Sequence, residues 1–582
     1  MADYHAPTRD LMFMLTEVLD AAHIRGLPDC DDYEPDTISA IVDEAGRFAS
    51  SVLAPLNASG DAEGVDWSAE GVTSASGFAD AYDRFVEAGW NGLTGDPEHG
   101  GMGMPRVLGA ATTELWNAAN MSFALCPLLT ASAVDALAHH GSEDLKAVYL
   151  DRLVSGEWTG CMDLTEPQAG SDLAQVRTRA EPDGEAWRLF GQKIYITWGE
   201  HDMAGNIVHL VLARLPDAPA GVKGISLFLV PKYIPDADGN PDERNDMRCA
   251  SVEHKLGIHA CPTCTMTYGE DGRGALGWLV GEANRGLAHM FTMMNAARHK
   301  MGVQGLGVAD RAYQQALAHA REREQGGAAI VEHADVKRML LSMRSRIDAL
   351  RALCLDSAAA MDVAERSDDE AERAAAQTRV DVLTPIVKGW GTEVGVALAD
   401  TGIQIHGGMG YIEETGAAQP LRDVRIAPIY EGTNGIQAID LVGRKLLRDE
   451  GRGMRALIAD MRATADGRAD GANPHPALAE GLDLMEQATD TLLAAGRDAA
   501  MANAFNYLML CGTVVGAWYA ARIADVAKAA LAAGTDEADF YEARQACARF
   551  YMRQVLPDAR GYAARIEGGA DAIDTVDAAR HL

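Results

Sequence analysis

Basic residues are scarce in this sequence for its length. Its 582 residues include 51 Lys and Arg against 85 Asp and Glu, which gives a formal net charge of −34. A surface of this sign repels the phosphates of nucleic acids and of anionic lipids. We therefore predict no nucleic-acid partner and no membrane partner.

The sequence also lacks the patterns that indicate a disulfide framework, a metal centre or secretion. Its nine cysteines are an odd number at irregular spacing, which does not suggest paired bridges. Cys261 and Cys264 form a lone CxxC with no second pair nearby, so no metal site is predicted. The first residues lack a basic segment followed by an apolar run, which predicts a cytoplasmic protein without a secretory signal.

One apolar stretch, residues 504–521, approaches the length of a membrane span. It is marginal in length and is interrupted by Asn506 and Thr513. Gly512 and Gly516 stand four residues apart within it, a spacing that permits close helix packing in a soluble bundle as well as in a membrane. We predict a buried helix rather than a transmembrane one.

The hydrophobic pattern changes twice along the chain. Hydrophobic residues make up 48% and charged residues 23%, which is typical of a globular protein with several domains. Helical spacing gives way to strand-like runs such as 206–214 and 225–230 and then returns. We predict a mainly α protein with a central small β domain. The predicted order is a helical extension (1–34), a helical domain (35–158), a β domain (159–278), a helical bundle (279–448), a Gly- and Asp-rich linker (449–476) and a C-terminal helical domain (477–582).

Glu431 is the candidate catalytic residue. It follows Ile429 and Tyr430 and precedes a Gly-Thr-Asn-Gly turn at 432–435. Apolar neighbours remove water from a carboxylate and raise its pKa towards that of a base useful at neutral pH. The glycines let backbone N–H groups approach an anionic ligand. The alternative is an acidic residue that caps a helix, and these residues alone do not separate the two.

Ordered motifs elsewhere in the chain favour the catalytic alternative. They are TEPQAGSD at 165–172, KIYIT at 193–197, QIHGGMGY at 404–411, LRD at 421–423 and YEGT at 430–433. Together they resemble the flavin-dependent acyl-CoA dehydrogenases. The resemblance implies an α domain, a β-barrel-like domain and a helical bundle, with FAD as cofactor and an acyl-CoA as substrate. It also implies that Glu431 removes the Cα proton as the thioester is oxidised to the trans-2-enoyl-CoA.

The same resemblance implies roles for individual residues. Those implied to contact the cofactor are Thr165, Gly170, Ser171, Tyr195, Thr197, Arg323, Gln404, Gly407, Gly408 and Thr433. Those implied to contact the substrate are Ser171, Asn295, Arg298, Tyr430 and Gly432. For Arg298 a structural ion pair is the alternative. In the family the positions of Arg323 and Gln404 contact the FAD of a neighbouring subunit, which implies a homodimer or a dimer of dimers, and the implied electron acceptor is electron-transfer flavoprotein.

The chain departs from the commonest family pattern at its end. The extra C-terminal domain, APTRDLMF at 6–13 and ITWGEHD at 196–202 resemble a bacterial subgroup, the 3-methylmercaptopropionyl-CoA dehydrogenases. That subgroup forms methylthioacryloyl-CoA during dimethylsulfoniopropionate degradation. The alternatives are a short- to medium-chain fatty acyl-CoA dehydrogenase, an acyl-CoA oxidase and a DNA-associated relative. Residues 451–582 hold 13 Lys and Arg against 18 Asp and Glu, which argues against DNA binding.

Overall fold

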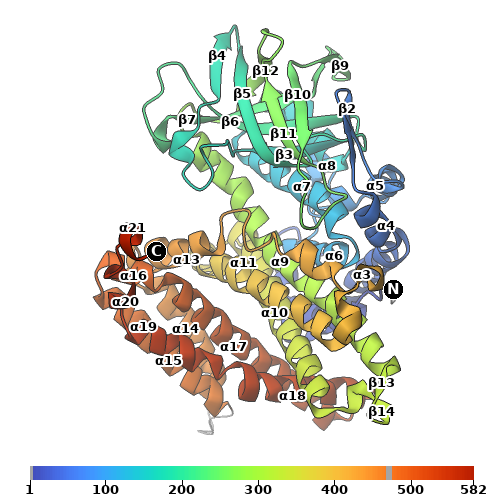
Figure 1. Cartoon of the computed structure of the whole chain (residues 1–582), viewed down its shortest axis with the longest axis vertical. Coiled ribbons are helices and arrows are strands. Elements are labelled where there is room, and N and C mark those ends of the chain that lie inside the picture. The colour runs from blue at the N-terminus through green and yellow to red at the C-terminus, as the bar shows by residue number, and fades with distance from the viewer. Residues whose placement is uncertain (1–3, 467–474) are drawn as a thin grey trace. The chain divides into compact units, whose positions relative to one another are not determined.

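The computed structural model describes residues 4–466 and 475–582. They form two compact units, each made of segments that are distant in sequence. One unit comprises Arg47–Met104 and Ala119–Ala297 and holds the main β sheet. The other comprises Met1–Gly46, Pro105–Ala118 and Arg298–Leu582 and is almost wholly helical (Figure 1). The predicted mainly α fold with a central β domain is confirmed.

The β unit is built on an eight-stranded sheet in the order β10-β11-β5-β12-β7-β6-β3, with β4 pairing β5 and β6. Its strands are β3 (Trp158–Asp163), β4 (Arg179–Asp183), β5 (Ala186–Thr197), β6 (Asn206–Arg214), β7 (Ile225–Pro231), β10 (Met247–Val252), β11 (Thr263–Tyr268) and β12 (Ala275–Leu279). Short hairpins pair β1 (Asp66–Ser68) with β2 (Gly71–Thr73) and β8 (Tyr233–Pro235) with β9 (Pro241–Arg244). The helices of this unit include α4 (Pro55–Glu63), α5 (Phe78–Glu87), α7 (Met121–His140) and α8 (Glu143–Ser155).

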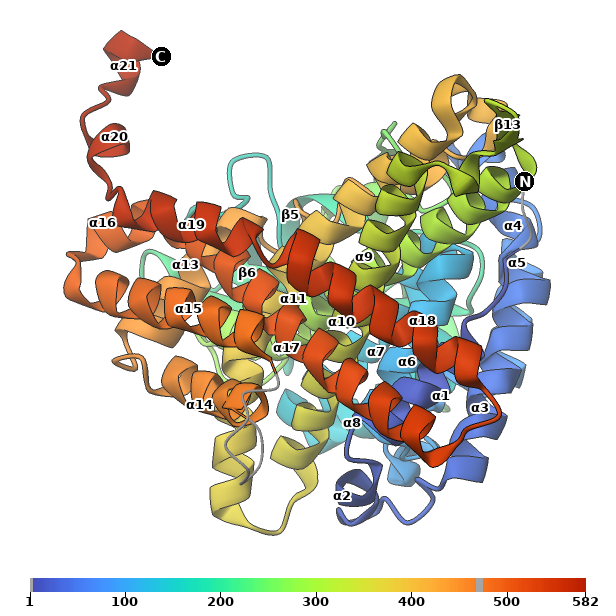
Figure 2. The ribbon, with the colours of Figure 1, turned by 90° about the horizontal axis from the view of Figure 1, so that it is seen from below.

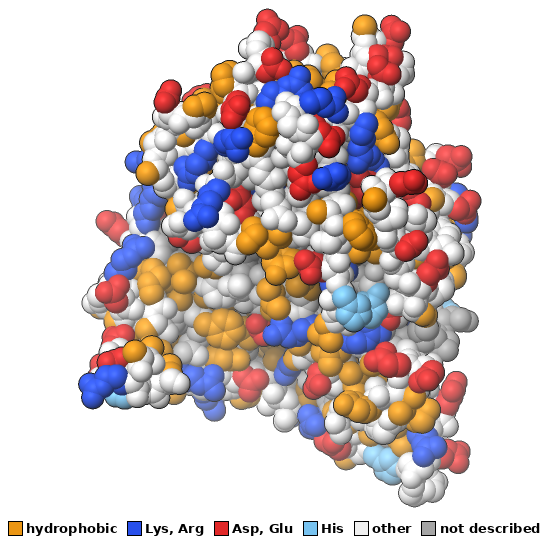
Figure 3. Space-filling model, turned by 45° about the horizontal axis from the view of Figure 1, so that its top comes forward, with side chains coloured by type: hydrophobic (Ala, Val, Ile, Leu, Met, Phe, Trp, Pro, Cys, Tyr) orange, Lys and Arg blue, Asp and Glu red, His pale blue; other side chains and the backbone are white. Residues whose placement is uncertain are grey.

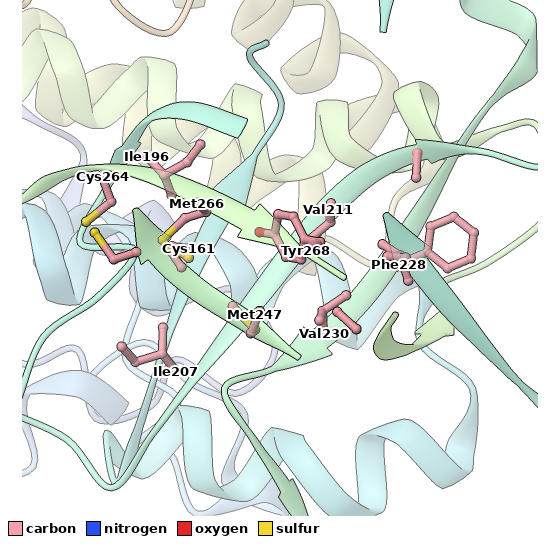
Figure 4. Packing of buried hydrophobic residues seen from close by; sticks show 14 of the residues in the cluster. Cys161, Ile196, Ile207, Val211, Phe228, Val230, Met247, Cys264, Met266 and Tyr268 are labelled. Carbon is pink, nitrogen blue, oxygen red and sulfur yellow. The ribbon is translucent and has the colours of Figure 1, made fainter. Parts of the chain in front are cut away.

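The core of this unit lies against the sheet, where Val211, Phe228 and Val230 pack together (Figure 4). All seven residues of β7 are buried, so an unbroken apolar run at this position is what the packing requires. The register places Cys161 of β3 beside His209 of the parallel strand β6.

A polar cluster sits within this apolar core. Cys161, Asp163 and His209 bring ligand-type atoms within 4.8 Å of one another, and Tyr268 Oη donates to Asp163 Oδ2 at 2.5 Å. Burial, reinforced by the charge of Asp163, raises the pKa of the Cys161 thiol. The thiol donates to Asp163 Oδ1 at 3.4 Å. The geometry is that of a hydrogen-bonded chain formed by strand pairing, which the spacing of these residues did not indicate.

The helical unit contains three long helices, α9 (Gly286–Glu322), which begins in the β unit, α10 (Ala334–Arg366) and α11 (Glu370–His406). Its N-terminal helices are α1 (Thr8–Phe13), α2 (Ala21–Arg25) and α3 (Pro35–Phe48), followed by α6 (Arg106–Ala119). Beyond α11 come α12 (Gln419–Val424), α13 (Asn434–Val442), α14 (Arg452–Asp466), α15 (Pro476–Ala494), α16 (Arg497–Ala502), α17 (Ala504–Ala533), α18 (Ala538–Phe550) and α19 (Asp558–Glu567). Figure 2 shows the C-terminal helices side by side, with α17 packed against α10, α11, α18 and α19.

Helix α17 contains the apolar stretch 504–521, and most of that stretch is buried in the protein. It and α7 are long and apolar enough to cross a membrane, but 83% of the apolar window of α17 and 78% of that of α7 are buried. A β-carbon at Gly512 would lie 2.2 Å from Trp390 Cγ, and one at Gly516 would lie 2.1 Å from Tyr551 Oη. The prediction of a closely packed buried helix is confirmed.

The predicted linker at 449–476 is wrong over Arg452–Asp466, which form α14. Met454, Leu457, Ile458 and Met461 are buried on one face of this helix. The apolar residues recur at helical spacing even though the segment is rich in Gly and Asp. Residues 467–474 of the predicted linker lie outside the described part of the chain.

Buried ion pairs join the N-terminal helix, the bundle and the C-terminal helices. Arg351 on α10 donates to Glu114 of α6 at 2.9 Å. Arg544 on α18 donates to Asp348 of α10 at 2.7 Å and also binds Asp10 of α1. Burial opposes ionisation, but the neighbouring arginines hold the pKa of Asp10 well below its usual range. The network fixes segments that are hundreds of residues apart in the sequence.

Candidate active site

Glu431 lies in a tight turn between α12 and α13. Both Glu431 (φ 56°) and Gly432 (φ 81°) adopt the left-handed conformation. This is natural for glycine but costs about 1–3 kcal/mol for another residue, and such strain collects at functional sites. The turn closes through a hydrogen bond from Asn434 N to Pro428 O of 2.9 Å. Thr433 caps α13, its Oγ1 accepting from Ile436 N at 3.3 Å.

Side chains from three helices hold the backbone of this turn. Arg298 of α9 and Gln437 of α13 donate to the carbonyl of Glu431 at 3.3 and 3.2 Å. Lys388 of α11 donates to the carbonyl of Gly432 at 2.8 Å. Among the described residues, the backbone N–H of Glu431 donates to no protein group. A free N–H beside a carboxylate is the arrangement that an oxyanion-binding turn needs.

The carboxylate of Glu431 is half-buried, and its environment sets its proton affinity. Burial raises the pKa of Glu431 to about 7, and the charges of Arg298 and Lys388 limit the rise. The direction agrees with the prediction from sequence, although Ile429 itself is 48% exposed. Near neutral pH such a group is present both as a carboxylate and as an acid, as a general base requires.

The residues implied to contact the substrate differ in solvent exposure and in their hydrogen-bond partners. Tyr430 is half-buried and its hydroxyl donates to Gln304 of α9. Asn295 is exposed on α9, whereas Arg298 is only 4% exposed. Arg298 Nη1 also lies 3.9 Å from Asp440 Oδ2, so the structural alternative has a partner in place. A direct contact of Arg298 with substrate stays a prediction.

The glycine motif after α11 forms an open surface. Gln404, Gly407 and Gly408 are exposed, and a β-carbon at either glycine would meet no atom within 4 Å. Gly407 ends α11 with φ 61°. Arg323 is also exposed, at the end of α9. Accessible backbone and a guanidinium are the groups that bind the phosphates of a dinucleotide, so these residues fit the implied cofactor.

The TEPQAGSD loop of the β unit is held by a buried ion pair. Burial alone would raise the pKa of Glu166, but Lys193, at 2.8 Å, and hydrogen bonds from Thr178 and Arg177 lower it to about 2. The Thr165 carbonyl accepts from Ile194 N at 2.9 Å. With its base fixed in this way, the loop exposes Gly170 and Ser171 to solvent, and their contact with the cofactor stays a prediction.

Tyr195 and Trp198 face different surroundings at the end of β5. Both have positive φ, 62° and 54°. Tyr195 is 61% exposed, as an aromatic surface for a flavin ring would be, whereas Trp198 is buried and its indole N–H donates to Ser122 O at 3.1 Å. Thr197 between them is half-buried. The bulky Trp198 therefore fills the core and leaves the exposed side of β5 to Tyr195.

Basic side chains gather on the face formed by the β unit (Figure 3). Arginines of the β unit are paired with acids, such as Arg188 with Asp183 at 2.7 Å and Arg273 with Glu243 at 2.8 Å. Exposed pairs of this kind are weak, about 0–1 kcal/mol each, so their arginines remain available to an anionic ligand. These basic side chains are a local exception in a chain whose formal net charge is −34.

Sequence reasoning missed three of the residues that hold the Glu431 turn. Lys388, Asn434 and Gln437 are all buried. The available signal was a lysine between apolar residues, Val387 and Trp390, within a helical run. A lysine in that position either reaches the surface with its long stem or has a buried partner, and the sequence does not say which.

Four family models match successive parts of the chain. They are the N-terminal, middle and C-terminal domains of acyl-CoA dehydrogenase at 35–157, 161–270 and 284–447, and an acetyl-CoA dehydrogenase C-terminal-like domain at 457–577. The chain is similar to 3-methylmercaptopropionyl-CoA dehydrogenase of Ruegeria pomeroyi, with 47% identity over 98% of this chain and 99% of the relative.

Other relatives carry different names. A butyryl-CoA dehydrogenase of Syntrophomonas wolfei is 32% identical, with 96% of each chain covered. Among solved structures, an acyl-CoA dehydrogenase of Bacillus anthracis complexed with FAD superposes with a TM-score of 0.74 at 20% identity, covering 95% of this chain and 91% of that one. At that identity the likeness concerns the fold.

Proposed function

Because the chain belongs to the acyl-CoA dehydrogenase family, an FAD-dependent family acting on the CH–CH bond of acyl-CoA, we propose that it oxidises 3-methylmercaptopropionyl-CoA to methylthioacryloyl-CoA. The observation that carries the choice of substrate is the 47% identity, over nearly the whole chain, to a relative of that name. The turn at Glu431 supplies the base that this reaction needs.

In the proposed reaction Glu431 takes the Cα proton of the thioester. With a pKa of about 7, its carboxylate is a far better proton acceptor than an ordinary exposed glutamate. The free N–H of Glu431 is available to the thioester oxygen as negative charge develops there. Tyr430 and Gly432 flank the base and would line the acyl chain. FAD, when bound, supplies the acceptor for the hydride that leaves Cβ.

The residues that would hold FAD are those already described. Exposed Tyr195 and half-buried Thr165 and Thr197 would meet the flavin, with Gly170 and Ser171 in the adjoining loop. Arg323, Gln404, Gly407 and Gly408 would contact the dinucleotide of a partner subunit, and Thr433 would contact the cofactor from the start of α13.

We also propose a cytoplasmic homodimer, or a dimer of dimers, that passes electrons to electron-transfer flavoprotein during dimethylsulfoniopropionate degradation. Support for self-association comes from the motif after α11. Met409 is 54% exposed and Tyr411 88% exposed, next to the open glycines. Apolar side chains in such positions favour burial in an interface.

A second candidate is a dehydrogenase of short straight-chain acyl-CoA, because the butyryl-CoA dehydrogenase relative also covers the whole architecture. A thioether is nearly isosteric with a methylene, so the two substrates differ little in shape. Anaerobic titration of the holoenzyme separates them by following bleaching of the oxidised flavin with 3-methylmercaptopropionyl-CoA, butyryl-CoA and octanoyl-CoA. Bleaching at the lowest concentration by the thioether substrate is expected.

If butyryl-CoA or octanoyl-CoA bleached the flavin at a lower concentration, the proposed substrate would be wrong, but the proposed dehydrogenation would still hold. Failure of all three to bleach the flavin would contradict the proposed reaction. Rapid reoxidation of the reduced flavin by air, measured as oxygen consumption, would instead indicate an acyl-CoA oxidase.

A further inference from the structure

Lys388 is a fully buried lysine whose hydrogen-bond partners, among the described residues, carry no charge. Its Nζ donates to the carbonyl of Gly432 at 2.8 Å and to Asn434 Oδ1 at 2.9 Å. Within the described residues no carboxylate lies within 4.0 Å of Nζ. Burying a charge without an opposite charge beside it is costly, so these two hydrogen bonds must offset part of that cost. Both of its partners belong to the turn that carries Glu431.

Asn434 links Lys388 to the turn in a fixed orientation. Its side-chain nitrogen donates to Gly389 O at 3.2 Å and to Glu393 Oε1 at 2.8 Å, both on α11. These bonds turn the amide oxygen of Asn434 towards Lys388. Its backbone N–H closes the turn on Pro428 O. Lys388 is therefore attached to the turn at two points.

The turn needs such support because Glu431 is in the left-handed conformation. The bond from Lys388 to Gly432 O, at 2.8 Å, is shorter than those that Arg298 and Gln437 make to Glu431 O. A charged donor also binds a carbonyl more strongly than a neutral one. The Lys388 bond fixes the peptide plane after Gly432, and the bonds of Arg298 and Gln437 to Glu431 O fix the plane between Glu431 and Gly432. Together they hold the backbone that follows Glu431 and so limit the directions of its side chain.

We propose that Lys388 is a positioning residue for Glu431, holding the strained turn through the Gly432 carbonyl and placing its amine beside that turn, where its charge acts on the carboxylate. This inference rests on the proposed function, in which Glu431 is the base. Lys388 itself touches neither substrate nor cofactor in this role.

The charges around the turn agree with this role. Burial lowers the pKa of Lys388 to about 7, while Glu431 and Glu393 raise it and Arg298 lowers it further. Burial raises the pKa of Glu431 to about 7, with Arg298 and Lys388 opposing. Asp440 and Arg444 face Arg298 and complete the set of charged groups at the turn. All of these except Lys388 stay in place in the Lys388 and Gln437 variants below.

The test compares Lys388→Met with Gln437→Met in the holoenzyme. Both substitutions keep the approximate length of the side chain and remove a donor from the turn, but only the first removes a charge. We expect Lys388→Met to lower kcat and to move the acidic limb of the pH profile of kcat/KM upward by about one unit, the lower end of the effect of a nearby opposite charge. Gln437→Met should lower kcat with the limb unmoved.

A second readout does not need turnover. The infrared band of the protonated Glu431 carboxyl, identified by its loss in Glu431→Gln, should titrate at higher pH in Lys388→Met than in the wild type. Lys388→Gln, which keeps a neutral donor, should show the same shift, whereas Lys388→Arg should keep the wild-type titration.

Several outcomes would overturn the inference. An unmoved limb in Lys388→Met and Lys388→Gln would show that the charge does not act on Glu431. An equal shift of the acidic limb in Gln437→Met would show that loss of a hydrogen bond to the turn, without loss of a charge, is enough to change the titration of Glu431. Loss of flavin-bound protein in all the Lys388 variants would indicate a purely structural role. Unchanged turnover in Glu431→Gln would contradict the proposed base, and that result is separate from the others.

Discussion

Substitution of Gly512 by alanine should loosen the attachment of α17 to the bundle. The added β-carbon would lie 2.2 Å from Trp390 Cγ and 2.5 Å from Trp390 Cβ. A rotamer change can move Trp390 Cγ but not Trp390 Cβ, so the two helices themselves must separate by about 1 Å or more to restore ordinary contact. Overpacking of this kind costs about 1–3 kcal/mol, against a gain of about 1 kcal/mol from the better helix propensity of alanine.

The chain offers a matched control in Gly561, on α19. A β-carbon there would meet no atom within 4 Å, so Gly561→Ala should keep only the gain in helix propensity. Thermal unfolding of the two holoenzyme variants under identical conditions measures the difference, with Gly512→Ala melting below the wild type and Gly561→Ala at or above it. Equal melting temperatures for the two variants would refute the reasoning from the helix contact.

Other expected outcomes concern the base and the buried ion pairs. Glu431→Gln should keep its flavin and lose about 10²- to 10⁴-fold in turnover, because a general base is removed; near-normal turnover would contradict the assignment. In the wild type, kcat/KM should fall about tenfold per pH unit below about 7, since Glu431 must lose its proton before it can accept one. If kcat/KM did not change between about pH 5 and about pH 7, the pKa of Glu431 would not be raised as described. Arg351→Met should cost about 3–5 kcal/mol by leaving Glu114 buried and unpaired, whereas Arg9→Met, at the exposed pair with Glu537, should cost about 0–1 kcal/mol; denaturant unfolding compares them.

Part of the fold could be predicted because its signals are local. Strand β6 has the bounds that its apolar run indicated, and β7 differs by one residue at its end. The hairpin β1–β2 and helix α14 escaped prediction. The hairpin strands are three residues each, too short to show a period, and the apolar face of α14 lies in a segment whose Gly and Asp content resembles a linker.

The candidate site also has features that the local sequence predicted and features that it did not. The sequence by itself determined that Glu431 follows apolar residues and precedes a glycine turn, and its motifs indicated the family. Only the tertiary structure decided that Lys388 and Arg298, from two other helices, lie at that turn and that the carboxylate has a pKa near 7. The physical reason is that proton affinity depends on water and charge within a few ångströms, and those distances exist only after distant segments have packed together.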